Sequence, residues 1–189
     1  MDDVAAVRRK REGLAFLIGF GLCIPAANWL IGNAGTICLP DGPCLIPVAP
    51  GIMAPSGVLM VGLALVMRDL VQRRLGLGWA TGAIFVGAAL SASLAPPALV
   101  VASATAFLLS EFADLVVYTP LQRRRLLLAV AASGVAGLIV DSVVFLYLAF
   151  GSLDFLLGQI VGKAWMVLLA LPLIAWLRGR DRRVGLAAA

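Results

Sequence analysis

The chain has 189 residues, of which 62% are hydrophobic and 13% are charged, and its mean hydropathy is +1.03. A water-soluble domain is about half apolar and about a quarter charged, because its surface must meet water. The composition therefore excludes an ordinary soluble domain and indicates a protein of the lipid bilayer. The net charge of +5 does not indicate a nucleic-acid partner, because there is no soluble domain to carry a phosphate-binding face.

A basic patch at residues 8–11 comes directly before the first apolar run, which starts near Leu14. Such a patch resembles the start of a signal peptide. No small-residue cleavage site followed by a soluble domain appears, so we expect this run to be retained as the first membrane span.

The apolar runs are continuous and about twenty residues long, the length of a helix that crosses a hydrocarbon core of about 30 Å. Barrel strands would instead alternate apolar and polar residues over about ten positions. We therefore expect an all-α membrane protein, a bundle of six transmembrane helices in a single integral membrane domain over residues 1–189. The expected spans are about 13–31, 55–75, 79–94, 98–118, 126–150 and 153–177. The third and fourth spans are separated by Ala95, Pro96 and Pro97, where two prolines end a helix.

The basic residues indicate the orientation of the chain. The connections at 32–54, 95–97 and 151–152 contain no Lys or Arg, whereas the other side of a six-span chain carries four basic clusters. The positive-inside rule then places both termini in the cytoplasm, and we expect a multi-pass protein of the bacterial inner membrane. We expect the clusters to meet anionic head groups. They lie at residues 8–11, 73–74, 123–125 and 178–183.

The connection at 32–54 is rich in Gly and Pro, and we expect a long outer loop that is either stapled by a disulfide or an irregular lid. It contains Cys38 and Cys44, which either form a disulfide or remain free thiols, and both alternatives stay open. The chain has no His and no CxxC pattern, so we expect no zinc or haem site and no cofactor.

Six charged residues fall inside the expected spans away from the basic clusters and the span ends, where each costs roughly 2.5–3.5 kcal/mol at a helix centre unless it meets a partner or a wet cavity. For Arg68 and Asp69, near the cytoplasmic face, we favour an ion-pair network that locks the bundle, with the Arg side chain extending toward the head groups. Asp141 and Lys163 lie deepest, and we favour a binding role for them. The six are Arg68, Asp69, Glu111, Asp114, Asp141 and Lys163.

Polar and aromatic side chains share faces on the last three spans. A stripe on the fourth span runs from Phe107 through Glu111 to Tyr118, at helical spacing. Asp141 and Phe145 are one turn apart on the fifth span. We therefore expect a midplane site formed by spans 4, 5 and 6, with Asn28 of the first span facing the cavity or capping its helix. The expected substrate-binding residues are Asn28, Phe107, Glu111, Asp114, Asp141, Phe145, Gln159 and Lys163.

This set suits a planar, nitrogen-rich solute. Rings stack on the faces of such a solute, and carboxylates and amides pair with its edge. The alternative is an interhelical ion-pair network, such as Lys163 with Asp141 or Glu111, that only holds the helices together.

Five segments of the later spans combine polar residues with aromatic residues or glycine in a fixed order. They are Ser110-Glu111-Phe112-Ala113-Asp114, Val117-Tyr118-Thr119-Pro120-Leu121, Asp141-Ser142-Val143-Val144-Phe145, Ala149-Phe150-Gly151, and Gly158-Gln159 with Lys163. Taken together and in order, they resemble the VUT family of queuosine-precursor transporters of bacterial inner membranes, and the resemblance covers roughly spans 2 to 6. It implies six spans, a fold similar to the substrate-binding subunits of energy-coupling-factor vitamin transporters, and uptake of 7-deazaguanines such as 7-cyano-7-deazaguanine. It also implies Glu111, Asp114, Asp141, Gln159 and Lys163 as binding residues.

Two other functions remain as alternatives. The first is a vitamin-binding subunit that works with a separate ATPase module. The second is an intramembrane aspartate enzyme that uses Asp114 with Asp141, although the chain has no His, no HExxH and no nucleophile with an evident base. We expect a transporter and not an enzyme. Its expected partners are a small nucleobase-like solute and the lipid bilayer, while a homodimer and an ATPase module are left open.

Overall fold

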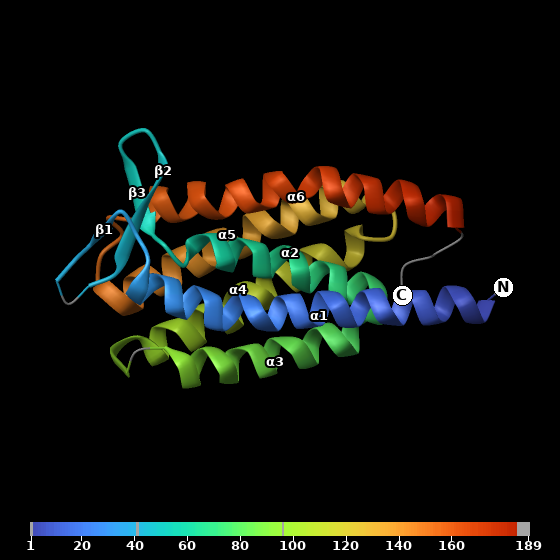
Figure 1. Cartoon of the computed structure of the whole chain (residues 1–189), viewed down its shortest axis with the longest axis horizontal. Helices are drawn as coiled ribbons and strands as arrows, with labels where there is room; N and C mark the ends of the chain where they lie inside the picture. The colour runs from blue at the N-terminus through green and yellow to red at the C-terminus, as the bar shows by residue number, and fades with distance from the viewer. Residues whose placement is uncertain (1, 41, 96, 185–189) are drawn as a thin grey trace.

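The computed structural model describes residues 2–40, 42–95 and 97–184, and within them the chain forms a bundle of six long helices whose axes run roughly alongside one another (Figure 1). The helices are α1 (Asp2–Asn33), α2 (Val58–Leu75), α3 (Leu77–Leu94), α4 (Val100–Leu121), α5 (Leu126–Phe150) and α6 (Leu156–Val184). A short 3-10 helix, η1 (Pro97–Leu99), lies between α3 and α4. The predicted break between the third and fourth spans is therefore confirmed, although Pro96 itself lies outside the described residues.

Polarity in this bundle is arranged inside out relative to a soluble protein. The side chains of Val101 and Val116 are 72% and 69% exposed, whereas Arg68 and Lys163 are completely buried. An apolar surface around a charged interior is stable only where lipid surrounds it. Five of the described helices, α1, α3, α4, α5 and α6, are long and apolar enough to cross a membrane. A multi-pass membrane protein is the conclusion that this distribution supports.

Helix α2 differs from the other five, because it carries four charged residues within its last eight positions. It nevertheless packs against all five of the other helices and has most of its residues buried. Protein rather than lipid surrounds α2, so the helix does not need an apolar sequence. Its charged residues need partners on the neighbouring helices instead. Since α2, with four charged residues among its 18, is not apolar enough to be identified as a span from its composition, six spans with both termini inside remain a prediction.

The connection between α1 and α2 is ordered, so of the two alternatives the irregular lid with free thiols is wrong. It forms a three-stranded antiparallel sheet in the order β1-β2-β3, from β1 (Ile37–Cys38), β2 (Cys44–Ala49) and β3 (Ile52–Pro55). A disulfide between Cys38 and Cys44 joins the first two strands, which resolves the alternative that the sequence left open. The purely all-α expectation missed this element, because its strands are short and interrupted by Gly and Pro.

The sheet lies at one end of the bundle and is attached to α6 (Figure 1). A Cβ at Gly158 would lie 2.0 Å from the carbonyl oxygen of Met53, so only glycine allows the start of α6 to approach β3 this closely. Further along α6, the indole Nε1 of Trp165 donates to the carbonyl of Val48 over 2.9 Å. Two contacts thus fix the sheet to the helix that carries Lys163.

The opposite end of the bundle, where the described N- and C-terminal segments lie, is closed by ion pairs between α1, α2 and α6 (Figure 1). Asp181 accepts from Arg74 over 2.8 and 2.9 Å and from Arg73 over 2.9 Å. Glu12 pairs with Arg74 at 3.0 Å and with Arg180 at 2.6 Å. The expectation that Arg73 and Arg74 meet lipid head groups was therefore wrong. Both are buried, because two acidic side chains from other helices neutralise them.

Replacing Asp181 with Asn should destabilise the protein, because it leaves Arg73 and Arg74 buried without their shared carboxylate. Removing one partner of a buried ion pair costs roughly 3–5 kcal/mol. We expect a lower melting temperature in detergent for Asp181→Asn. The matched control is Asp154→Asn, which removes an exposed carboxylate bonded to Ser152 and should leave the melting temperature nearly unchanged. Equal stability of the two variants would contradict this account of the bundle end.

Candidate functional site

A cavity of about 90 Å³ lies between the helices, in the half of the bundle that carries the sheet. Its walls come from the second half of α1, the first half of α2, the end of α3, the first half of α4, the end of α5 and the beginning of α6. Most of the lining is apolar, and the polar groups come from several helices. The polar and aromatic lining residues are Asn28, Ser91, Ser103, Phe107, Ser110, Glu111, Asp141, Phe145 and Gln159.

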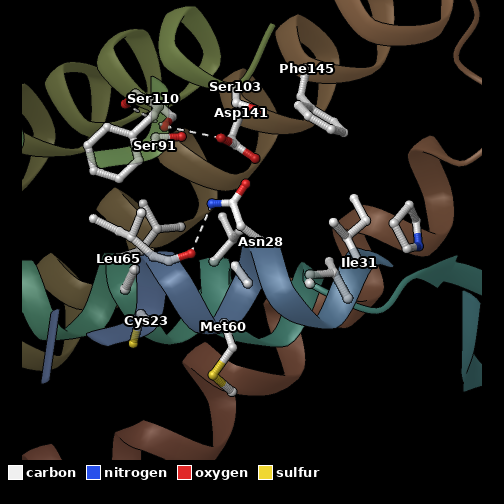
Figure 2. A pocket seen from close by; sticks show the side chains of 18 of the residues that line it. Cys23, Asn28, Ile31, Met60, Leu65, Ser91, Ser103, Ser110, Asp141 and Phe145 are labelled. Atoms are coloured by element: carbon white, nitrogen blue, oxygen red, sulfur yellow. Dashed lines mark hydrogen bonds between the residues drawn. The ribbon is translucent and has the colours of Figure 1, made fainter. Parts of the chain in front are cut away.

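The polar groups converge from different helices (Figure 2). Asp141 of α5 and Asn28 of α1 extend into the cavity from opposite walls. The hydroxyl of Ser110 on α4 lies 3.5 Å from Oδ1 of Asp141, at the limit of a hydrogen bond. The amide Nδ2 of Asn28 donates to the carbonyl of Ile24 over 2.9 Å. Asn28 thus faces the cavity while its nitrogen is held by its own helix, which leaves the amide oxygen to meet a guest.

Behind this wall, Lys163 holds the Asp141 carboxylate. Its Nζ donates to Oδ2 of Asp141 over 2.6 Å and to the hydroxyl of Ser142 over 2.8 Å, and it also donates to Oε1 of Gln159. All three ammonium donors therefore have acceptors, so the buried charge is both neutralised and fully hydrogen-bonded. The pair leaves Oδ1 of Asp141 directed away from Lys163, toward Ser110.

A close approach of two backbones positions Lys163. A Cβ on Gly62 of α2 would lie 2.9 Å from both the Cα and the carbonyl oxygen of Lys163. Only a glycine lets α2 touch α6 there, and this contact keeps the ammonium group inside the bundle.

A second buried network surrounds Arg68 on α2. Its three nitrogens each meet a different carboxylate: Nη1 lies 3.1 Å from Asp69, Nε 3.0 Å from Glu111 and Nη2 2.8 Å from Asp114. The guanidinium carbon also lies 5.8 Å from the centre of the Tyr118 ring. The expectation that the Arg68 side chain extends to the head groups was wrong, because three carboxylates inside the bundle hold it.

Neutral side chains complete the Arg68 network. The hydroxyl of Ser133 on α5 donates to Oδ2 of Asp69 over 3.1 Å, and Gln72 accepts from Arg68 over 3.2 Å. Gln72 in turn donates to Thr119 over 3.0 Å. The expected ion-pair network of Arg68 and Asp69 is therefore present, and it connects α2, α4 and α5.

Six of the eight residues expected to bind a solute line the cavity: Asn28, Phe107, Glu111, Asp141, Phe145 and Gln159. Asp114 and Lys163 are not in the lining. They stand behind it, where Asp114 pairs with Arg68 and Lys163 pairs with Asp141. Whether any of the eight contacts a solute remains a prediction.

The expectation that spans 4, 5 and 6 form the site was incomplete. The lining includes many residues of α1 and α2, among them Ala27, Met60 and Leu65. These are apolar residues within apolar runs, and nothing in the sequence separates a cavity wall from a lipid-facing wall there. A Cβ on Gly87 would lie 2.6 Å from the ring of Phe107, so α3 also supports the wall from behind.

The sequence was compared with known proteins. The sequence profile of a family described as "Putative vitamin uptake transporter" matches residues 91–177, a little less than half of the chain. Over these residues the chain is therefore similar to a family of uptake transporters. No curated protein and no solved structure matches the chain. The matched segment contains the polar cavity residues from Ser91 to Gln159, whereas Asn28 and Arg68 lie outside it.

The arrangement bears on the other chemistries considered. In the part of the chain that the structure describes, no group of three or more Cys, Asp or Glu side chains is placed to hold a metal ion. Asp114 and Asp141, the pair imagined for an aspartate enzyme, belong to different networks, with Arg68 and with Lys163. A match to a transporter family is consistent with a protein that is not an enzyme.

The Lys163–Asp141 contact can be measured by a double-mutant cycle with Lys163→Met and Asp141→Asn. Each single change leaves a buried group without its partner, whereas the double change removes both. We expect the losses of stability to be non-additive, with a coupling of about 0.5–3 kcal/mol. Thermal unfolding in detergent provides the measurement. Additive losses would show that the two side chains do not interact in the folded protein.

Proposed function

We propose that the protein imports a planar, nitrogen-rich solute of the 7-deazaguanine class across the bacterial inner membrane. The observation that carries this proposal is the composition of the cavity wall, in which two carboxylates, two amides and two phenyl rings surround one apolar space. The similarity to an uptake transporter over residues 91–177 supports the transport part of the proposal. The resemblance of the Glu111, Asp141 and Lys163 segments to queuosine-precursor transporters supports the solute class.

The hydrogen-bonding groups of the cavity complement the edge of a deazaguanine. Such an edge offers N–H donors and a carbonyl acceptor side by side. Oδ1 of Asp141 accepts from the donors, since Lys163 holds the other oxygen. The amide of Gln159 donates to the carbonyl, because its Oε1 is already taken by Lys163 and its Nε2 is left as the free group. Phe107 and Phe145 supply flat apolar contacts to the ring system.

Transport requires that the cavity be exposed in turn to each side of the membrane. In the proposed topology both termini are cytoplasmic and α2 is the second of six spans. The sheet and the cavity then lie in the outer half of the bundle. The inner half is filled by a core that includes Leu70, Tyr118 and Ile174 and is closed at its end by Asp181 and Glu12. The structure therefore fits an outward-side solute site, and import proceeds by parting the helices of the inner half.

A vitamin-binding subunit that works with an ATPase module is the second candidate. The description of the matched family, which names vitamin uptake, is the observation that favours it. The two candidates differ in their solute and in their need for a partner. A protein that transports alone accumulates its solute in vesicles that contain no other protein, whereas a binding subunit only binds it.

Binding separates the candidate solutes. Purified protein should be stabilised against heat by 7-cyano-7-deazaguanine, and less by thiamine, riboflavin or biotin. At a concentration 100 times the dissociation constant the stabilisation is about 2.7 kcal/mol. Asp141→Asn should abolish the shift, because the carboxylate is the acceptor for the N–H donors, and Asp154→Asn should preserve it. Stabilisation by a vitamin and not by the deazaguanine would favour the second candidate.

Uptake in cells tests the proposed function directly. Cells that cannot make the precursor should regain queuosine in their tRNA when they express this protein and are supplied with precursor. Asp141→Ala and Lys163→Ala should remove this gain while the protein still inserts. Unmodified tRNA despite good membrane expression of the wild-type protein would refute the proposal.

The orientation can be tested with cysteine labelling in intact spheroplasts. After mild reduction, a membrane-impermeant maleimide should label Cys38, because we place the sheet outside the inner membrane. The variant with Cys38→Ser and Cys44→Ser should lose this label, since Cys23 is buried. In that background Arg124→Cys, on the exposed turn between α4 and α5, should react only after the membrane is opened. The reverse pattern would overturn the proposed topology.

A further inference from the structure

The two buried networks differ in charge balance. Lys163 and Asp141 form a neutral pair, whereas Arg68 is surrounded by the three carboxylates of Asp69, Glu111 and Asp114. If all three were ionised, the Arg68 network would carry two uncompensated negative charges. Arg68 and these carboxylates are each no more than 1% exposed. Charges buried in this way are stable only when they are paired, and an unpaired carboxylate binds a proton instead.

The unpartnered groups of the network point to the same conclusion. In the described part of the chain, Oδ2 of Asp114 and the hydroxyl of Tyr118 are buried and have no hydrogen-bond partner. Both side chains are completely buried, next to Arg68. Ser133 donates to Oδ2 of Asp69. The oxygens of Asp114 and Tyr118 that have no hydrogen-bond partner are both on α4. On the α4 side the network therefore lacks the positive charge or the hydrogen-bond donor that Oδ2 of Asp114 needs, and the Tyr118 hydroxyl has no acceptor.

Glu111 connects this network with the cavity. Its Oε2 accepts from Nε of Arg68 over 3.0 Å, and the same residue is part of the cavity lining. Asp69 and Asp114 do not line the cavity. Glu111 is thus the member of the network that a proton can reach from the solute site.

We propose that solute uptake is coupled to inward proton movement and that Glu111 carries the proton. A proton from the outer side binds the Glu111 carboxylate and forms a neutral carboxyl, which breaks the ion pair with Nε of Arg68. The carboxyl then donates its O–H to an acceptor on the solute, so proton and solute bind together. After the inner half opens, both leave and the ion pair with Arg68 forms again. This inference rests on the proposed import function.

The charged and titratable surroundings of Glu111 fit this role. From α2 it faces Arg68 and Asp69, on its own helix it lies one turn from Asp114, and across the cavity α5 presents Asp141. From α6, Lys163 reaches the region only through Asp141, and α1 contributes the thiol of Cys23 to the lining. Arg68 and Lys163 are the cations among these groups, and both are paired with carboxylates. The other groups are acidic or neutral, so the surroundings of Glu111 favour the binding of a proton.

A proton fits the network better than a metal cation. Hard cations such as Ca²⁺ take about six to eight oxygen ligands, arranged around an open centre. Here the centre is filled by the Arg68 guanidinium, and the described residues contain no group of three acidic side chains placed to hold a metal ion.

Reconstituted vesicles that contain only this protein test the coupling. With labelled 7-cyano-7-deazaguanine, an interior more alkaline than the exterior should drive accumulation, and a pH dye inside should report proton entry when solute is added. Glu111→Gln imitates the protonated state, so we expect slowed solute exchange without a gradient and loss of gradient-driven accumulation. Asp141→Asn should lose both, and the exposed Asp154→Asn should keep both. Accumulation that follows a sodium gradient and ignores pH would overturn the proposal.

The proton site can also be tested without solute, independently of the import function. Infrared spectra of purified wild-type protein should show the carbonyl band of a protonated carboxyl at neutral pH, and the band should shift in heavy water. Glu111→Gln should weaken it without abolishing it, because Asp69 and Asp114 still outnumber the one guanidinium of Arg68. Absence of the band in the wild type, or its loss only in Asp114→Asn, would overturn the assignment to Glu111. If the band is present but no solute binds or is exchanged, the import function fails and the proton site stands.

Discussion

A guanidinium that is buried away from both water and lipid needs a hydrogen-bonding or charged partner for each of its nitrogens. Arg68 is such a group, and the packing of the helices around it has to supply these partners. Its three nitrogens meet carboxylates from α2 and α4, and the hydroxyl of Ser133 links α5 to the same network. The most polar helix therefore lies where protein surrounds it, and the apolar helices take the positions next to lipid. The position of the cavity, on the sheet side of Arg68, follows from this packing.

The bundle contains two kinds of buried charge. The Lys163 pair is neutral and fully hydrogen-bonded, which suits a fixed wall that keeps Asp141 in one orientation. The Arg68 network has an excess of acid, and Glu111 extends it to the cavity. One network thus holds the shape of the site, and the other supplies the group whose charge changes. The ion pairs of Glu12 and Asp181 belong to a third set, which only closes the end of the bundle.

Hydropathy and spacing predicted the helices well, because a bilayer demands long apolar runs and the runs of this chain are uninterrupted. The stripe of Glu111, Asp114 and Tyr118 is buried as its helical spacing indicated. Interhelical partners could not be predicted in the same way. Arg73 and Arg74 look like a head-group cluster until Asp181, more than a hundred positions later, is found beside them. The sheet was missed because short strands with Gly and Pro give little local signal.

The attachment of the sheet to α6 has a mechanical consequence. Gly158, in the first turn of α6, packs against β3, and two turns later Trp165 donates a hydrogen bond to β2. These two contacts lie on either side of Lys163 along α6. The disulfide between Cys38 and Cys44 joins β1 to β2 in the same sheet. In the proposed topology the sheet faces the periplasm, so a nanobody bound to it would restrict the movement of α6 and hold one conformation without entering the membrane or touching the solute.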